Sequence, residues 1–149
     1  MKRNLKWTIA VLLVLTIIAL LIFPIGKSFA LPFTAEDVSS IILWSFWGYK
    51  EATDRDDIVM IVEEVNDTRL CGEFDFDNYE PRAGDYGCDF YFFMKDGRIY
   101  EYSTMPKAGL TSLFRDADGT CYKAKGISSD RILENLNIAY QSGNPFDKE

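Results

Sequence analysis

The residues of this chain that are best suited to chemistry are the acids between Cys71 and Gly87. Calcium is bound by several oxygen ligands that converge on one point, and five carboxylates here are close enough in sequence to converge. These candidate ligands are Glu73, Asp75, Asp77, Glu80 and Asp85. The stretch is not an EF-hand loop, because Glu80 stands at the sixth position from Asp75, where that loop needs glycine. Acids that are simply solvated in a loop are the alternative.

Three cysteines, Cys71, Cys88 and Cys121, permit one disulfide and leave at least one thiol free. Cys71 and Cys88 flank the acidic stretch, and a bridge between them would close a loop of 18 residues. Such a bridge stabilises by about 3 kcal/mol in the chain-entropy model. The alternative is three reduced, partly buried thiols. We expect Cys121 to point into the core, unless Tyr122 takes that place.

The sequence contains no recognisable catalytic motif. Histidine, the usual general base near neutral pH, is absent, so a cysteine nucleophile would lack its partner. The GxSxG, SxxK and P-loop patterns are absent too. Paired carboxylates can hydrolyse a glycoside, but the acids here lie in turns, helix caps and helix surfaces. We therefore expect no catalytic residue, no cofactor and no zinc site, in a protein that is not an enzyme.

Aromatic residues are the remaining candidates for binding. Asp96-Gly97 between two β-rich segments predicts a hairpin with a two-residue loop. Its register places four rings on one face: Tyr91, Phe93, Tyr100 and Tyr102. Exposed aromatic groups bind sugars or protein partners, whereas covered ones belong to the core. We expect the tyrosine face to be covered, and we keep as candidate binding aromatics Trp44, Trp47, Tyr100 and Tyr102.

These side chains would be positioned by an α+β fold. Apolar patterns and turn residues predict strands over 38–47, 88–94, 99–104, 111–114 and 120–124. Capping residues and apolar stripes predict helices over 53–66 and from Ser128 or Ser129 onward. The expected fold is an antiparallel sheet of about four to five strands with two helices packed on one face, preceded by an N-terminal transmembrane or signal helix. A helix in front of a curled meander is the alternative.

The N-terminal segment has the composition of a membrane-targeting sequence. Residues 7–26 carry no charge and follow the basic cluster of Lys2, Arg3 and Lys6, and 20 helical residues cover the roughly 30 Å apolar core of a bilayer. Basic residues stay in the cytoplasm, so the rest of the chain is expected outside. Ser28-Phe29-Ala30 resembles a signal-peptidase site, which leaves open cleavage after Ala30 or a retained anchor.

The chain is therefore divided into a membrane anchor or signal peptide (1–30), one extracytoplasmic domain (31–142) and a polar tail (143–149). All 23 acids follow residue 30, whereas four of the 16 basic residues precede it, which leaves a formal charge of −11 on the exported part. Such a surface repels nucleic acid and suits a basic partner or a cation.

Three features of residues 31–66 resemble the uncharacterised membrane-anchored or secreted extracytoplasmic domain families of Clostridia-type Gram-positive bacteria. These features are Leu31-Pro32-Phe33 behind an apolar leader, Asp37-Val38 leading into a strand, and a helix over Thr53 to Val65. The resemblance implies a location outside the cytoplasmic membrane and no particular activity.

The preferred hypothesis is a membrane-tethered, non-catalytic domain that binds or modulates an envelope protein. Its expected partners are the lipid bilayer, through residues 7–26, and an unknown envelope protein, with no nucleic acid. The alternative is a secreted domain, released after Ala30, that binds a small ligand such as a sugar or Ca²⁺.

Overall fold

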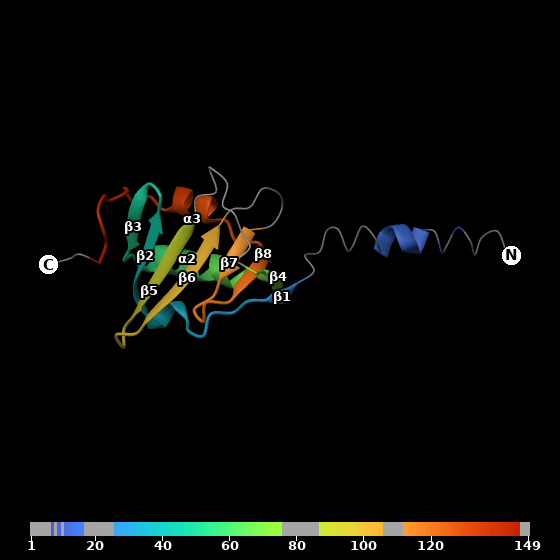
Figure 1. Cartoon of the computed structure of the whole chain (residues 1–149), viewed down its shortest axis with the longest axis horizontal. Coiled ribbons are helices and arrows are strands. Elements are labelled where there is room, and N and C mark those ends of the chain that lie inside the picture. The colour runs from blue at the N-terminus through green and yellow to red at the C-terminus, as the bar shows by residue number, and fades with distance from the viewer. Residues whose placement is uncertain are drawn as a thin grey trace.

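A computed structural model describes Trp7, Ile9 and residues 11–16, 26–75, 87–105 and 112–146. Within these residues one antiparallel sheet has eight strands in the order β1-β4-β8-β7-β6-β5-β2-β3 (Figure 1). The strands are β1 (Lys27–Ser28), β2 (Val38–Ser45), β3 (Gly48–Ala52), β4 (Arg69–Glu73), β5 (Cys88–Met94), β6 (Ile99–Met105), β7 (Ser112–Arg115) and β8 (Cys121–Lys125). Three short helices accompany them: η1 (Ala35–Asp37), α2 (Arg55–Asn66) and α3 (Ser129–Asn135).

The predicted sheet of four to five strands is wrong, because β1, β3 and β4 were not recognised. The segment 38–47 was expected to be one strand, but it ends at Ser45, and Phe46-Trp47 form a turn into β3. Gly48 makes this turn with φ +113, a conformation that favours glycine. Phe46 and Trp47 are aromatic, and aromatic residues favour strands. The strand pattern in the sequence therefore extended through the turn, and the end of β2 at Ser45 was not predicted.

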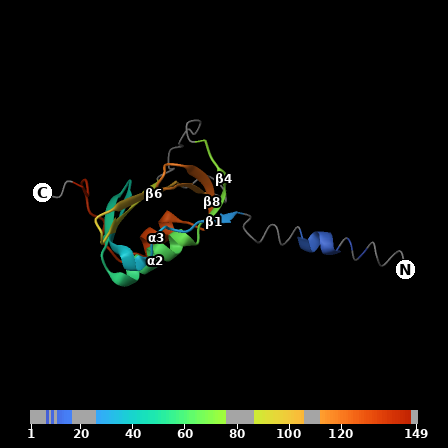
Figure 2. The same cartoon turned by 90° about the horizontal axis from the view of Figure 1, so that it is seen from below.

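The sheet is curled, and α2 and α3 lie inside its curve (Figure 2). This arrangement is nearer to the alternative, a helix in front of a curled meander, than to the expected sheet of four to five strands with two helices packed on one face. We call the face toward these helices the inner face and the opposite one the outer face.

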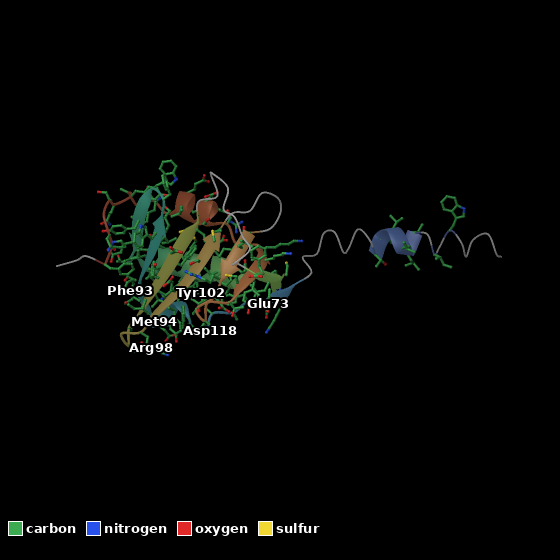
Figure 3. The ribbon with its side chains drawn as sticks, viewed as in Figure 1. Glu73, Phe93, Met94, Arg98, Tyr102 and Asp118 are labelled. Atoms are coloured by element: carbon green, nitrogen blue, oxygen red, sulfur yellow. The ribbon has the colours of Figure 1, made fainter. Side chains whose placement is uncertain are left out.

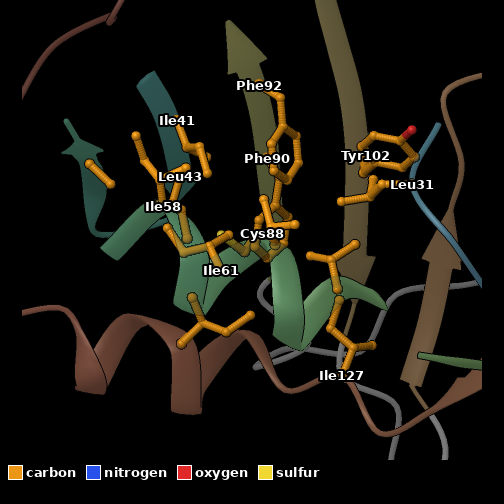
Figure 4. Packing of buried hydrophobic residues seen from close by; sticks show 14 of the residues in the cluster. Leu31, Ile41, Leu43, Ile58, Ile61, Cys88, Phe90, Phe92, Tyr102 and Ile127 are labelled. Carbon is orange, nitrogen blue, oxygen red and sulfur yellow. The ribbon is translucent and has the colours of Figure 1, made fainter. Parts of the chain in front are cut away.

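Helix α2 follows its sequence prediction closely. Asp54 is the N-cap and accepts a hydrogen bond from the Asp56 N–H at 2.9 Å. The predicted apolar stripe is buried in full: Ile58, Ile61, Val62 and Val65. Figure 4 shows Ile58 and Ile61 packed toward Ile41, Leu43 and Phe90 of the inner face.

Helix α3 is shorter than predicted. Ser128 is its N-cap, as expected, but the helix ends at Asn135. Ile132, Leu133 and Leu136 are buried, whereas Tyr140, expected on the same apolar face, is 42% exposed.

The first hairpin differs from its prediction by one residue. Met94 N–H donates to the Arg98 carbonyl at 2.9 Å and Gly97 N–H donates to the Met94 carbonyl at 3.0 Å. These bonds enclose a three-residue loop, closed by Gly97 in the left-handed region at φ +88. The second hairpin, around Asp116 and Gly119, has the same pattern of bonds.

This shift exchanges the faces of two tyrosines, since a one-residue slip turns a strand over. Phe90 pairs with Tyr102 and Phe92 pairs with Tyr100, so both tyrosines share the inner face with the phenylalanines. The predicted face of Tyr91, Phe93, Tyr100 and Tyr102 is therefore wrong.

Burial of Tyr102 gives the protein a sensitivity to high pH. The ring is 2% exposed, and its desolvation, helped by Tyr100, raises the pKa of Tyr102 to about 12 from 10.0. Between these pH values the unfolded chain releases the phenolic proton while the folded protein keeps it. The contribution of protonated Tyr102 to the free energy of unfolding is therefore fully present below pH 10 and is lost as the pH rises toward 12. We expect urea midpoints to fall between pH 10 and 12, and to fall less in Tyr102→Phe. An equal fall in both proteins would contradict this assignment.

A membrane-spanning helix, which the sequence analysis expected, is not found in the described part of the chain. Residues 11–16 are helical, and no helix among the described residues is long and apolar enough to cross a membrane. The fold prediction is therefore wrong on this point for the described residues, and several positions between 7 and 26 lie outside them.

Lys50 is a buried cation that the sequence analysis did not single out. It lies on β3 at 6% exposure, and its Nζ donates to the carbonyls of Leu133 at 2.6 Å and Leu136 at 3.0 Å. The end of a helix leaves such carbonyls without intrahelical partners and carries partial negative charge. Lys50 therefore fastens the end of α3 to the edge of the sheet.

Replacement of Lys50 by Met keeps an apolar stem and removes the three N–H donors. Hydrogen bonds to charged groups contribute about 1.5–3 kcal/mol, and we expect a loss of stability of that size in urea unfolding. The control is Lys95→Met, at an exposed position, which should change stability little. Equal stability of the two variants would show that Lys50 does not hold α3.

Candidate functional site on the outer face

One row of side chains crosses six strands on the outer face. Each member stands directly opposite the next in the register of neighbouring strands. The row, from β3 to β8, is Tyr49, Trp44, Asp89, Ser103, Arg115 and Cys121. Directly opposite side chains in an antiparallel sheet are about 4.5–5.5 Å apart at Cβ, so this row, called here the outer row, places an aromatic group, an acid, a hydroxyl, a base and a thiol in sequence.

A pocket of about 360 Å³ lies over the middle of the outer row. Its floor is low because Asp89 and Ser103 are short and Gly87 has no side chain, whereas Trp44 and Arg115 on either side are long. Other lining residues are Ser45, Phe46, Thr104, Met105, Leu113, Phe114 and Cys121. The volume falls in the range of small-molecule sites, which combine apolar walls with a few polar groups.

The polar groups of the pocket form a continuous network. Ser103 Oγ donates to Asp89 Oδ1 at 2.6 Å and accepts from Arg115 Nη2 at 2.8 Å. Arg115 Nη2 also lies 2.8 Å from Glu101 Oε1, an ion pair at the exposed rim. The hydroxyl therefore links a carboxylate to a guanidinium and fixes the orientation of both.

The electrostatic balance of this network is negative. Two carboxylates, Asp89 and Glu101, face one guanidinium, Arg115. The neighbouring Tyr91 responds to them: burial first, then the charges of Asp89 and Glu101, raise its pKa to about 12, against the opposing effect of Arg115.

Aromatic side chains close the pocket on the β2 side. Trp44 is half-buried, and Phe46 lies 65% exposed at the turn between β2 and β3. Phe146, from the C-terminal segment, contacts Trp44 with ring centroids 5.9 Å apart and Tyr91 at 4.8 Å. Backbone bonds between Gln141 and Tyr49 bring this segment onto the outer face, where Phe146 packs against Trp44 and Tyr91.

The predicted calcium ligands do not meet in the described residues. Glu73 and Asp75 are exposed at the end of β4, whereas Asp77, Glu80 and Asp85 lie outside the described residues. Figure 3 shows Glu73 at the β4 side of the sheet, far across it from Phe93 on β5. No group of three or more His, Cys, Asp or Glu that could hold a metal occurs among the residues that are described.

The cysteines are all free thiols in this structure. Cys71 on β4 and Cys88 on β5 are separated in the sheet by β8, β7 and β6, so the predicted bridge is not formed here. Cys88 is 1% exposed, and burial raises the pKa of its thiol far above the usual range. Cys121 was expected in the core, but it is half-buried at the pocket, because β8 places Ala124 on the inner face instead.

The candidate binding aromatics are divided between three environments. Trp44 lines the pocket, and Trp47 is 68% exposed at the turn, in contact with Phe46 at 5.3 Å between ring centroids. Tyr102 is core, and Tyr100 packs against the core at its edge. Asp89, Ser103 and Arg115 were not among the predicted site residues, and only a correct register of β5, β6 and β7 would have brought them together.

Comparisons with protein-family models, with curated proteins and with solved structures gave no match to this chain.

Proposed function

We propose that this protein is a non-catalytic binding domain, displayed outside the cytoplasmic membrane, that takes a small organic ligand in the pocket of the outer row. The single observation behind the proposal is the junction of an apolar wall with the Asp89–Ser103–Arg115 network in a space of small-molecule size. The extracytoplasmic location is supported by the uncharged segment 7–26 behind a basic cluster. Mass measurement of the protein from cells would tell a retained leader from cleavage after Ala30.

Binding rather than catalysis is favoured by the state of the polar groups. The Ser103 hydroxyl donates to Asp89 and accepts from Arg115, so the three groups are held in one hydrogen-bonded network. The thiol of Cys121 has a raised pKa, caused first by burial, which disfavours the reactive thiolate. These groups are suited to recognise a ligand through hydrogen bonds and charge.

The test is a pocket-filling substitution. The full-length protein is mixed with a small-molecule extract of the cell envelope, recovered by ultrafiltration and analysed by mass spectrometry. Ser103→Phe fills the pocket floor, whereas Ser142→Phe adds the same ring at an exposed position of the C-terminal segment. A small molecule retained by the wild type and by Ser142→Phe, but not by Ser103→Phe, supports the proposal. Retention that is equal in all three, or absent in all three, contradicts it.

A second candidate function is docking to an envelope protein through the turn between β2 and β3. Its supporting observation is the pair Phe46 and Trp47, 65% and 68% exposed at adjacent positions. Large exposed aromatic groups are typical of the centre of a protein interface. Crosslinking in intact membranes from position 47, with position 95 as the exposed control, tests this candidate: a specific product from both positions, or from neither, contradicts it.

A further inference from the structure

The charges around the pocket are not balanced. Arg115 forms an ion pair with Glu101 at 2.8 Å and donates a hydrogen bond to Ser103. Glu101 therefore neutralises the positive charge of Arg115 at the rim of the pocket. Asp89 accepts from the Ser103 hydroxyl and makes no ion pair with another described residue. A hydroxyl donor orients this carboxylate without neutralising it, which leaves one negative charge at the floor of a largely apolar pocket.

The uncompensated carboxylate stands directly beside an indole. Trp44 and Asp89 are opposite one another in the pairing of β2 with β5, and both line the pocket with Phe46. In a pocket lined by both groups, a cation is attracted by the charge of the carboxylate and by the negative face of the aromatic ring. The ring favours a soft, alkylated cation, because a strongly hydrated ion gains little from an apolar wall.

On these observations we infer that the ligand of the pocket is a small organic cation, an alkylated ammonium group seated between Trp44 and Asp89. The inference rests on the proposed function, in which this pocket is the ligand site. The aromatic wall of Trp44 and Phe46 surrounds the alkyl groups, and Asp89 supplies the opposite charge. A calcium ion does not fit the same place, since it requires six to eight oxygen ligands, and an anion would meet the net negative charge of Asp89 and Glu101.

Choline and 3,3-dimethylbutan-1-ol test the inference directly, because they share one shape and differ in charge. Calorimetric titration of the full-length protein should show choline binding at least about ten-fold more tightly than the neutral alcohol. Asp89→Asn should weaken choline binding about ten-fold or more and leave the affinity for the alcohol unchanged. Asp118→Asn, which removes an exposed acid from the turn between β7 and β8, should change neither affinity.

A reciprocal variant makes the test independent of Asp89. Arg115→Met removes the only described positive charge that lines the pocket, and choline should then bind more tightly. Equal affinities for choline and the alcohol, or choline binding that Asp89→Asn and Arg115→Met do not alter, would overturn the cation as ligand. Glucose and N-acetylglucosamine serve as neutral probes of the same pocket: binding of either in place of choline overturns the inference and leaves the proposed function standing. The mass-spectrometric test could also identify a molecule that the wild type retains and Ser103→Phe does not. If that molecule carries no ammonium group, it likewise overturns the inference and leaves the proposed function standing.

Discussion

Ile61→Asp is expected to unfold the domain. Ile61 is 0% exposed, at the centre of the α2 stripe that packs on the inner face (Figure 4). An aspartate there would be a buried charge without a partner, which costs several kcal/mol and exceeds the stability of many domains of this size. Circular dichroism should show loss of the cooperative urea transition.

Ile61→Val is the graded control for this substitution. It removes one methylene group and should cost about 0.5–1.5 kcal/mol while the domain stays folded. A folded Ile61→Asp variant with an unchanged transition would show that α2 does not pack inside the curl of the sheet.

Tyr102→Ala should destabilise the domain by about 3–5 kcal/mol, the range for loss of a large core ring. Tyr102 is 2% exposed and stacks on Phe114, with centroids 5.9 Å apart and planes at 19°. Tyr91→Ala, on the same hairpin but on the outer face, should cost about 1 kcal/mol, because its ring is only partly buried.

The comparison of these two variants tests the hairpin register. With the two-residue loop expected from the sequence, Tyr91 and Tyr102 would share one face and respond alike. With the observed three-residue loop they lie on opposite faces, and their losses of stability in urea unfolding should differ by several kcal/mol. Equal losses of stability would favour the register of the two-residue loop over the observed one.

The sequence predicted those features that depend on interactions between residues close together in the chain, namely helix α2 and the positions of the two hairpin turns. The capping residues Thr53 to Asp56 and the 3.6-residue apolar period placed α2 to within two residues, because both act within one helix. The glycines at 97 and 119 marked both hairpins. Asp-Gly alone did not decide between a two-residue and a three-residue loop, and that single residue set which face each tyrosine occupies.

Features that depend on partners far along the chain were not predictable in the same way. β3 is held in the sheet by its pairing with β2 and by Lys50. The partners of Lys50 are the carbonyls of Leu133 and Leu136, which are far along the chain. The order of strands had no local signal, since β4 joins the sheet beside β8. Short strands with polar residues gain their stability from these neighbours.

The outer row is the clearest case. Trp44, Asp89, Ser103 and Arg115 come from four strands, and no spacing in the sequence connects them. The acidic stretch was predicted as a site because its residues are close in sequence. The pocket instead combines residues that are distant in sequence and opposite in register.

The most direct test of the central claim uses two tryptophans as reporters. Trp44 lines the pocket of the outer row, whereas Trp47, three residues away, lies on a separate groove with Lys50 and Tyr140. The indole N–H signals of the ¹⁵N-labelled protein are followed by NMR as choline is added. We predict a saturable shift of the Trp44 signal and an unchanged Trp47 signal. A shift of Trp47 with Trp44 unmoved, or no saturable shift of Trp44 with choline or with the neutral probes, would contradict the outer row as the binding site.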